Sequence, residues 1–367
     1  MSTTIRTAAR TPLSGSAGFS LVELIVAMGI TTVIMGATMA GLADVAKGSE
    51  TVLNMTAMNR ALGSGMDLIE RDLLGTAAGL PLSHVVLVPS GAGSTAIRLP
   101  GPPGTAFTST AVNIAAVIPR PGAGPVINGN ATDVLTVLMV DTSFVNIALS
   151  AVTSTSVDIA AGPSLTVGAT RVSPGQLMMI SKGSTTTLVQ VTAVNTSTRQ
   201  LTFATGDSLN LNQTAAAFGN LAALNATAPA SSPANTWISR VRMLTYYLDA
   251  TIDPARPRLV RRVNNGHPTT FDNNLGTVIG MDIENLRFSY DLIDGATNPS
   301  AVRMTATDLG VGGSCAPSAC SPNQIRKVNI LLTARSSNGA NPTATVFHNT
   351  LTSQVSLRGM AFINEYQ

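Results

Sequence analysis

The sequence has few charged and few aromatic residues for its length. Of its 367 residues, 11% are Asp, Glu, Lys or Arg and 4% are Phe, Trp or Tyr, whereas about a quarter of a typical globular chain is charged. The net charge is +3, and without Arg6 and Arg10 the balance is 20 basic against 19 acidic residues, or +1. So small a charge gives no strong field for nucleic acid or anionic lipid, and the few aromatic side chains argue against a base-stacking platform.

Sequence motifs of the common enzyme classes are also missing. There is no Gly-x-Ser-x-Gly, no phosphate loop of the Gly-Lys-Ser/Thr kind and no His-Glu-x-x-His. A phosphate site can be imagined where three acids and four arginines lie close in sequence, but a solvated hairpin face fits that pattern better. These residues are Asp249, Asp253, Asp272, Arg256, Arg258, Arg261 and Arg262. We therefore expect a non-enzymatic protein that needs no cofactor.

Metal ligands are scarce as well. The three histidines, His84, His267 and His348, are scattered along the chain, and a zinc site would need two of them beside the two cysteines. Asp291 and Asp294 could help to hold calcium, but the spacing of an EF-hand loop is absent. No metal site is predicted.

The two cysteines lie close together. Cys315 and Cys320 stand in Gly-Ser-Cys-Ala-Pro-Ser-Ala-Cys-Ser-Pro, with four residues between them. If this part of the chain is periplasmic, a disulfide that closes a tight loop is expected. Two free thiols in a surface loop are the alternative.

What the sequence does have is a long apolar run near its N-terminus. From Phe19 to Ala43 the run contains a single charged residue, Glu23, and a basic, polar leader that ends at Gly18 precedes it. The run is long enough to cross a bilayer as a helix. A carboxylate inside such a segment costs about 2–3 kcal/mol near the bilayer centre, so it is normally kept for a function.

The string Gly18-Phe-Ser-Leu-Val-Glu23 resembles the class III signal of type IV pilins and type II secretion pseudopilins. The resemblance implies that a prepilin peptidase cuts between Gly18 and Phe19 and that the amine of Phe19 is then methylated. It also implies that Glu23 acts in assembly with other pilins. An ordinary secretory signal or anchor, cut after Gly41-Leu-Ala43, is the alternative, but its apolar region would be unusually long and would contain Glu23.

The helix is predicted to continue well past the membrane, from Phe19 to about Gly75. No proline occurs between Pro12 and Pro81 to break it. After residue 43 an apolar stripe recurs mainly at three- and four-residue steps, as expected for one face of a helix. Its members are Val45, Val52, Met55, Met58, Leu62, Met66, Ile69 and Leu73. We expect residues 19–43 to form the membrane or filament-core segment and residues 44–79 to form a stem that packs on a globular domain.

The remainder reads as short β-strands between clusters of Gly, Pro, Asn and Ser. Expected strands are Val85–Val88, Val112–Ile118, Val134–Val140, Ser156–Ile159, Gln176–Ile180, Thr187–Val194, Gln200–Phe203, Val241–Leu248, Arg258–Val263, Ile283–Leu292, Arg326–Ala334 and Thr352–Phe362. Residues 205–235, rich in Ala, Asn and Ser, are interpreted as an insertion or linker between β-rich regions at 80–204 and 236–367. The expected fold is α+β: a long N-terminal helix packed on a β-rich domain, as in pilins.

The later strands extend the resemblance. Val241-Arg-Met-Leu-Thr-Tyr-Tyr-Leu-Asp249 and Ile283-Glu-Asn-Leu-Arg-Phe-Ser-Tyr-Asp291 look like the C-terminal half of PilW-type minor pilins, although Gly359 stands where that family often has Asn. Pseudopilins of the GspJ type share much of this outline. The resemblance implies a minor, tip or priming pilin held in the inner membrane with a periplasmic domain and displayed on a cell-surface pilus. A secretion pseudopilin and a tip adhesin or DNA-uptake protein are the alternatives.

Overall fold

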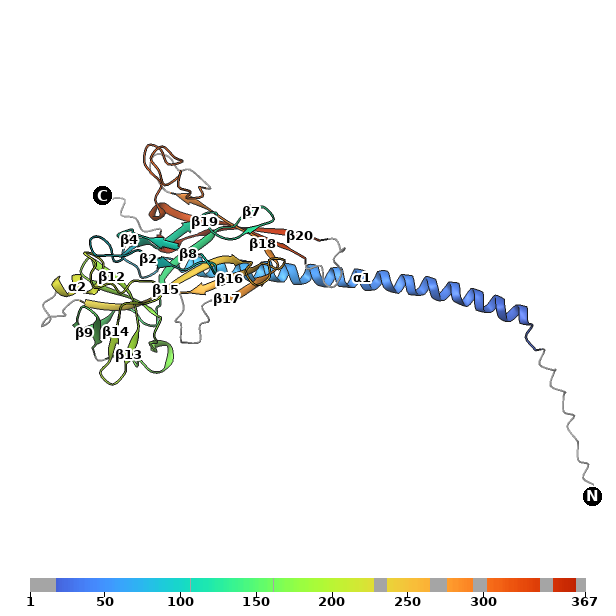
Figure 1. Ribbon diagram of the computed structural model, residues 1–367, viewed down its shortest axis with the longest axis horizontal. Coiled ribbons are helices and arrows are strands. Elements are labelled where there is room, and N and C mark those ends of the chain that lie inside the picture. Colours follow the sequence, from blue (N-terminus) through green and yellow to red (C-terminus); the bar gives the residue numbers. More distant parts are fainter. Residues whose placement is uncertain are drawn as a thin grey trace, which may run out of the picture. The chain divides into compact units, whose positions relative to one another are not determined.

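The structure is a computed structural model that describes residues 18–105, 107–160, 162–227, 236–264, 276–292, 302–336 and 346–360 (Figure 1). The chain divides between Asn54 and Met55 into two compact units. Most of the expected leader, residues 1–17, lies outside the described residues.

One long helix, α1, runs from Leu21 to Leu74 over 54 residues. The predicted long helix is therefore confirmed, and it ends where expected. Beyond Leu74 the chain turns at Ala77, whose φ is +64°. Within the second unit, the side of α1 that carries Met58, Leu62, Met66, Ile69 and Leu73 is buried. We call the part of α1 from Met55 to Leu74 the stem.

The second unit consists mainly of antiparallel strands. Their bounds are β1 (Val85–Leu87), β2 (Ile97–Leu99), β3 (Phe107–Ser109), β4 (Asn113–Ala115), β5 (Val117–Arg120), β6 (Val126–Ile127), β7 (Asn130–Ala131), β8 (Val134–Val140), β9 (Ile147–Val152), β10 (Ser156–Ile159), β11 (Leu177–Lys182), β12 (Thr185–Gln190), β13 (Ala193–Asn195), β14 (Gln200–Thr202), β15 (Thr236–Asp249), β16 (Arg258–Val263), β17 (Thr277–Met281), β18 (Ile283–Leu292), β19 (Ile325–Arg335) and β20 (His348–Ser356). A short helix, α2, spans Leu221–Thr227, and three 3-10 turns span Gly168–Thr170, Pro322–Gln324 and Arg358–Met360.

The largest sheet is organised around β15, a strand of 14 residues. Its first half pairs with β11 and β9 and its second half with β16, while β8 pairs along its middle. A separate three-stranded sheet has the order β18-β19-β20. These two sheets and the stem share one hydrophobic core, in which Ile69 and Leu73 of the stem meet Tyr246 of β15 and Phe288 of β18.

A second core lies among β9, β10, β14 and their neighbours. It contains Phe144, Val157, Leu201 and Phe203 together with Leu221 and Leu224 of α2. The proposed linker at 205–235 contributes Leu209 and Leu211 to a third core cluster, and residues 228–235 lie outside the described part of the chain. The division of the β-rich region into two parts stays a prediction.

The strand predictions differ from the structure at several points. Residues 134–140 and 283–292 form β8 and β18 as expected. The expected strand Val112–Ile118 is wrong as one unit, because it divides into β4 and β5. The last strand begins at His348 and ends at Ser356, not at 352–362, and residues 358–360 form a 3-10 turn. Pairing with β19, and not local apolar content, sets those bounds.

Candidate functional site

The site predicted from the sequence lies at the N-terminal end of α1. Gly18 and Phe19 precede the first helical residue and are exposed, and Phe19 is 85% accessible. A Cβ atom added to Gly18 would meet no atom within 4 Å, and its φ is not in the left-handed region. The fold of this chain therefore has no need of glycine at position 18. A requirement for glycine there must come from another molecule, such as a peptidase that binds the segment.

Ser20 and Glu23 together cap the start of the helix. The Ser20 hydroxyl accepts a hydrogen bond from the Val22 backbone N–H at 3.2 Å, and the Glu23 carboxylate accepts one from the Ser20 backbone N–H at 2.9 Å. This reciprocal arrangement is close to a capping box, which satisfies backbone donors that have no partner inside the helix. The Ser-x-x-Glu spacing is the sequence signal for this cap, and the interpretation of Glu23 as an assembly residue alone missed it.

The side chains that follow leave a wholly exposed apolar surface. Every residue from 18 to 50 is exposed. By length and composition, α1 could cross a membrane. The hydroxyls of Thr31 and Thr32 donate to backbone carbonyls four residues earlier, at 2.7 Å each. This surface therefore presents few polar groups that need water, as a lipid or a filament core requires.

A polar contact joins the stem to the β-domain. Asp72 of the stem accepts hydrogen bonds from the Tyr246 hydroxyl and from Arg261 Nε, the latter at 2.6 Å. Burial, together with the bond to Asp72, raises the pKa of Tyr246 above its usual value, so the phenol remains a donor. Asp72 and Tyr246 are buried among apolar neighbours and Arg261 is partly exposed, and we expect this contact of three side chains to fix the rotation of the stem on the sheet.

The acids and arginines considered for a phosphate site do not converge. Arg258 pairs with Asp249, Arg256 pairs with Asp282 at 2.9 Å, and Arg261 pairs with Asp72. Asp249 is 1% exposed, so the predicted solvated hairpin face is wrong for this residue. Its pair with Arg258 and two hydrogen bonds from Thr251 offset the cost of burying its charge. Asp272 lies outside the described residues. Each of these three arginines is engaged by a separate carboxylate, and the buried Arg262 donates to the Gly101 carbonyl at 3.2 Å. Among the described residues, the four arginines therefore form no common anion site.

The predicted disulfide is present between Cys315 and Cys320, with Cα atoms 5.2 Å apart. The loop around it is organised by Asp308, whose carboxylate accepts hydrogen bonds from Ser314 and from the backbone and hydroxyl of Thr305. The backbone N–H of Cys320 also donates to the Asp308 carbonyl at 3.0 Å. The bridge and the aspartate thus hold one local loop in shape.

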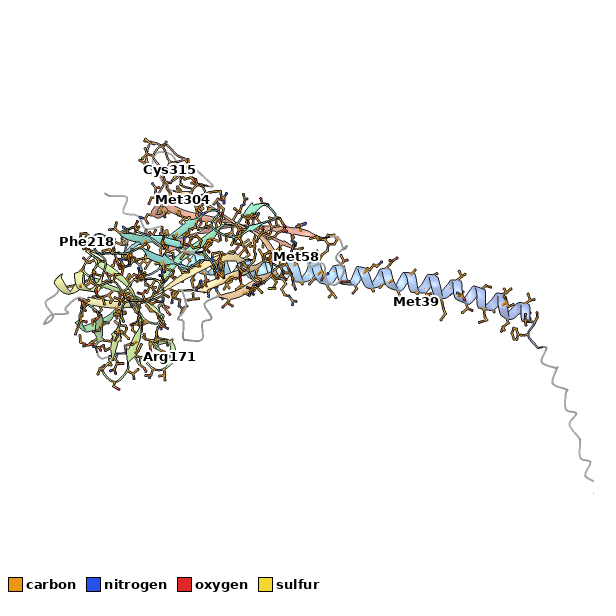
Figure 2. The ribbon with its side chains drawn as sticks, viewed as in Figure 1. Met39, Met58, Arg171, Phe218, Met304 and Cys315 are labelled. Carbon is orange, nitrogen blue, oxygen red and sulfur yellow. A yellow bond between two sulfur atoms is a disulfide. The ribbon has the colours of Figure 1, made fainter. Side chains whose placement is uncertain are left out.

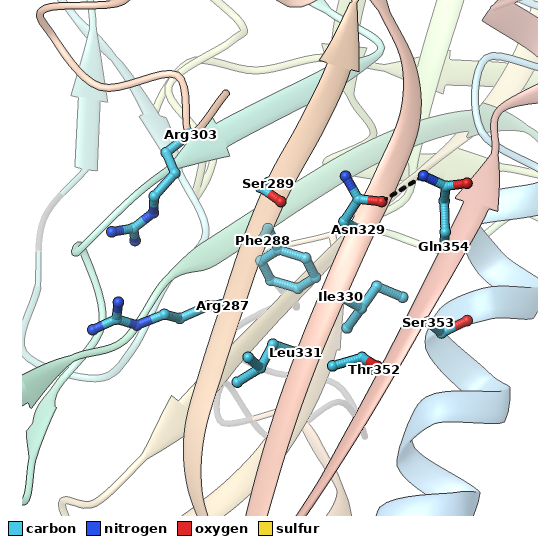
Figure 3. Close-up of a pocket in the computed structure, with 10 residues that line it drawn as sticks. All are labelled: Arg287, Phe288, Ser289, Arg303, Asn329, Ile330, Leu331, Thr352, Ser353 and Gln354. Atoms are coloured by element: carbon cyan, nitrogen blue, oxygen red, sulfur yellow. Dashed lines mark hydrogen bonds between the residues drawn. The ribbon is translucent and has the colours of Figure 1, made fainter. Parts of the chain in front are cut away.

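A shallow hollow of about 530 Å³ lies on the open face of the three-stranded sheet (Figure 3). Arg287 and Arg303 extend to one side of it, and on the other side Gln354 Nε2 donates to Asn329 Oδ1 at 2.8 Å. The Asp291 carboxylate accepts hydrogen bonds from the side-chain amides of Asn329 and Gln354, at 2.9 and 3.0 Å. Asp291, one of the two residues considered for calcium, is therefore engaged within the sheet. Asp294 lies outside the described residues, and the described part of the chain has no cluster of three or more metal-ligating side chains.

Comparison with known protein families gives a match that covers the N-terminal site. Residues 13–39 match the family model described as the prokaryotic N-terminal methylation motif. No curated protein and no solved structure matches the chain. The matched segment contains Gly18, Phe19 and Glu23, and it leads into a long helix whose stem packs against an antiparallel β-rich domain. The chain is therefore a pilin-like protein with a prepilin-type N-terminal methylation motif.

Proposed function

We propose that this protein is a minor subunit, at the tip or in the priming complex, of a type IV pilus. In this proposal the prepilin peptidase cuts the inner-membrane precursor between Gly18 and Phe19, and the amine of Phe19 is then methylated. The helix from Phe19 onward enters a filament among other pilins, and the β-domain faces the periplasm and then the cell exterior. The observation that carries the proposal is the methylation motif at residues 13–39 followed by an apolar helix surface that this chain leaves entirely exposed.

The geometry of Glu23 supports a role in assembly. One carboxylate oxygen, Oε2, accepts the Ser20 N–H, whereas Oε1 has no hydrogen-bond partner among the described residues. After cleavage, the new amine of Phe19 is positively charged. An amine from a neighbouring subunit could then meet Oε1 and neutralise the carboxylate inside an apolar core, where an unpaired charge is costly.

Substitution of Glu23 tests this role. Glu23→Ala should leave processing and membrane insertion intact, because insertion of an apolar helix improves when a charge is removed. Recruitment into filaments should fail, since the partner amine would be buried without a counter-charge, at a cost of several kcal/mol. Glu23→Asp, shorter by one methylene, should be intermediate, and Glu50→Ala in the same helix is the matched control.

The measurement is the amount of chain recovered in sheared filaments and in membranes for each variant. Normal recovery of the Glu23→Ala protein in filaments would show that Glu23 serves helix capping or processing and not assembly.

A type II secretion pseudopilin of the GspJ type is the second candidate, because the same motif directs pseudopilins to the same peptidase. Deletion of the gene distinguishes a pilus subunit from a pseudopilin. Loss of a pilus subunit reduces surface filaments, whereas loss of a pseudopilin blocks release of secreted proteins and leaves surface pili unchanged.

A further inference from the structure

The two edge strands of the three-stranded sheet, β18 and β20, differ in whether their outward backbone groups have hydrogen-bond partners. We infer that the edge formed by β20 is a docking site for an extended, uncharged strand of the next pilin-like subunit in the filament. This inference rests on the proposed function and adds the surface through which the β-domain recognises a neighbour.

The β18 edge is closed. Asp133 donates its backbone N–H to the Leu286 carbonyl and accepts the Phe288 N–H on its carboxylate, each at 2.9 Å. Farther along, Tyr290 and Val302 exchange two backbone hydrogen bonds of 2.7 and 2.9 Å. The Leu286 carbonyl, the Phe288 N–H and both backbone groups of Tyr290 thus have partners within the chain, and these contacts obstruct the addition of a further strand along this stretch of β18.

The β20 edge is open. β19 and β20 pair over nine residues without a bulge. Ser336 N–H donates to the Phe347 carbonyl and Leu357 N–H to the Arg326 carbonyl, at 2.8 Å each. Since hydrogen-bonded pairs alternate in an antiparallel ladder, the odd-numbered residues of β20 bond to β19. The even-numbered residues direct their backbone groups outward, and these groups have no partner among the described residues: His348, Thr350, Thr352, Gln354 and Ser356.

The sequence of this edge lacks the usual protections. Natural edge strands discourage pairing by charged residues, prolines, bulges or a covering segment. His-Asn-Thr-Leu-Thr-Ser-Gln-Val-Ser has no Asp, Glu, Lys, Arg or Pro. Its even-numbered residues are all exposed. Apart from His348, which pairs with Glu284 at 2.6 Å, an added strand would meet no ionisable side chain of β20. Its side chains would lie beside Thr352 and Gln354 at the rim of the hollow described above (Figure 3).

Two strands could occupy the β20 edge: the β20 strand of a second copy, or a strand from another surface of a neighbouring subunit. The direction of β20 favours the second. Asn349 bonds to Asn59 at 2.8 Å, and Gly359, just beyond β20, approaches the carbonyl of Thr76. β20 therefore runs in the same direction as the stem. If two copies paired their β20 strands antiparallel about a two-fold axis, the two stems would run antiparallel to each other, which does not suit stems packed side by side in one filament. A strand from a different surface of a neighbouring subunit can pair with the outward backbone groups of β20 and leave the two stems parallel.

Hydrogen exchange of the full chain, free in detergent and in sheared filaments, tests the inference. The amides of Thr350, Thr352 and Gln354 should exchange rapidly in the free chain and at least tenfold more slowly in filaments, because a new strand would then accept their hydrogen bonds. The amides of Leu351 and Ser353, which face β19, should be slow in both forms and serve as the internal control. Filaments that contain the chain but leave the three outward amides fast would overturn the inference while the proposed function stands.

A proline variant tests the same edge by assembly. Thr352→Pro removes an outward donor without removing a bond to β19, since edge strands tolerate proline where the N–H faces outward. Recovery in filaments should fall several-fold, whereas Thr352→Val, which keeps the N–H, should assemble normally. Slow exchange at Leu351 and Ser353 verifies that the proline variant keeps its fold, and its normal assembly would contradict the inference.

The remaining outcomes separate the alternatives. The native cysteines are both in the disulfide, so Thr352→Cys provides a single free thiol. Efficient Thr352→Cys homodimers in membranes would identify a two-fold pair as the occupant and overturn the choice of a neighbouring subunit. A chain that is neither cut after Gly18 nor recovered in filaments would reject the proposed function, and the inference with it.

Discussion

The two halves of α1 share one continuous helix but differ in what surrounds them. From residue 18 to residue 50 every side chain is exposed, including Leu24, Val33 and Met39. From Met58 onward one face is buried, and Ile69 and Leu73 are 0% exposed. The labelled Met39 and Met58 mark these two environments in Figure 2.

The difference shows which part of the apolar surface of α1 the chain buries by itself. The predicted apolar stripe runs from Val45 to Leu73, but Val45 and Val52 remain 70% and 62% exposed. The stem buries its stripe against the chain's own sheets. Among the described residues of its own unit the N-terminal half has no such partner, as expected for a surface that lipid or other subunits bury.

The largest effect is expected from a substitution that creates a cavity beneath the stem. Ile69→Ala should reduce the free energy of unfolding of the β-domain by about 2–5 kcal/mol, because it removes buried methylene and methyl groups from the shared core. Ile34→Ala is the matched control in the exposed half, and it should change this free energy by less than about 0.5 kcal/mol. Denaturant unfolding of the full chain in detergent, followed by Trp237 fluorescence, measures both. Equal effects of the two variants would refute the distinction between the halves.

A smaller effect is expected from the polar contact of the stem. Asp72→Asn should cost about 1–3 kcal/mol, because Arg261 loses the carboxylate to which it donates and hydrogen bonds to charged groups are the stronger ones. Asp67→Asn supplies the control, since Asp67 is exposed on the same helix. Denaturant midpoints of the two variants provide the comparison. If Asp72→Asn is as neutral as Asp67→Asn, the contact does not position the stem.

The sequence predicted the long helix and the main strands because their signals are local. An unbroken apolar run without proline determines α1, and a β-branched run determines β8. The cap formed by Ser20 and Glu23 was not predicted, although the Ser-x-x-Glu spacing is a local signal for it. The closed edge of β18 was not readable from the sequence, because Asp133 meets Leu286 and Phe288 only after folding. β20 was misplaced because its polar residues carry little strand signal, and pairing with β19 sets its bounds.

The central claim is that the exposed half of α1 belongs to a processed pilin-like subunit. The most direct test is mass spectrometry of the N-terminal peptide of the chain, isolated from cells with an active prepilin peptidase, beside a Gly18→Arg variant. We predict that the wild-type chain begins at Phe19 with one methyl group on its amine and that the variant remains uncut. A chain that begins at Met1 in these cells, or one cut after Ala43, would contradict the account.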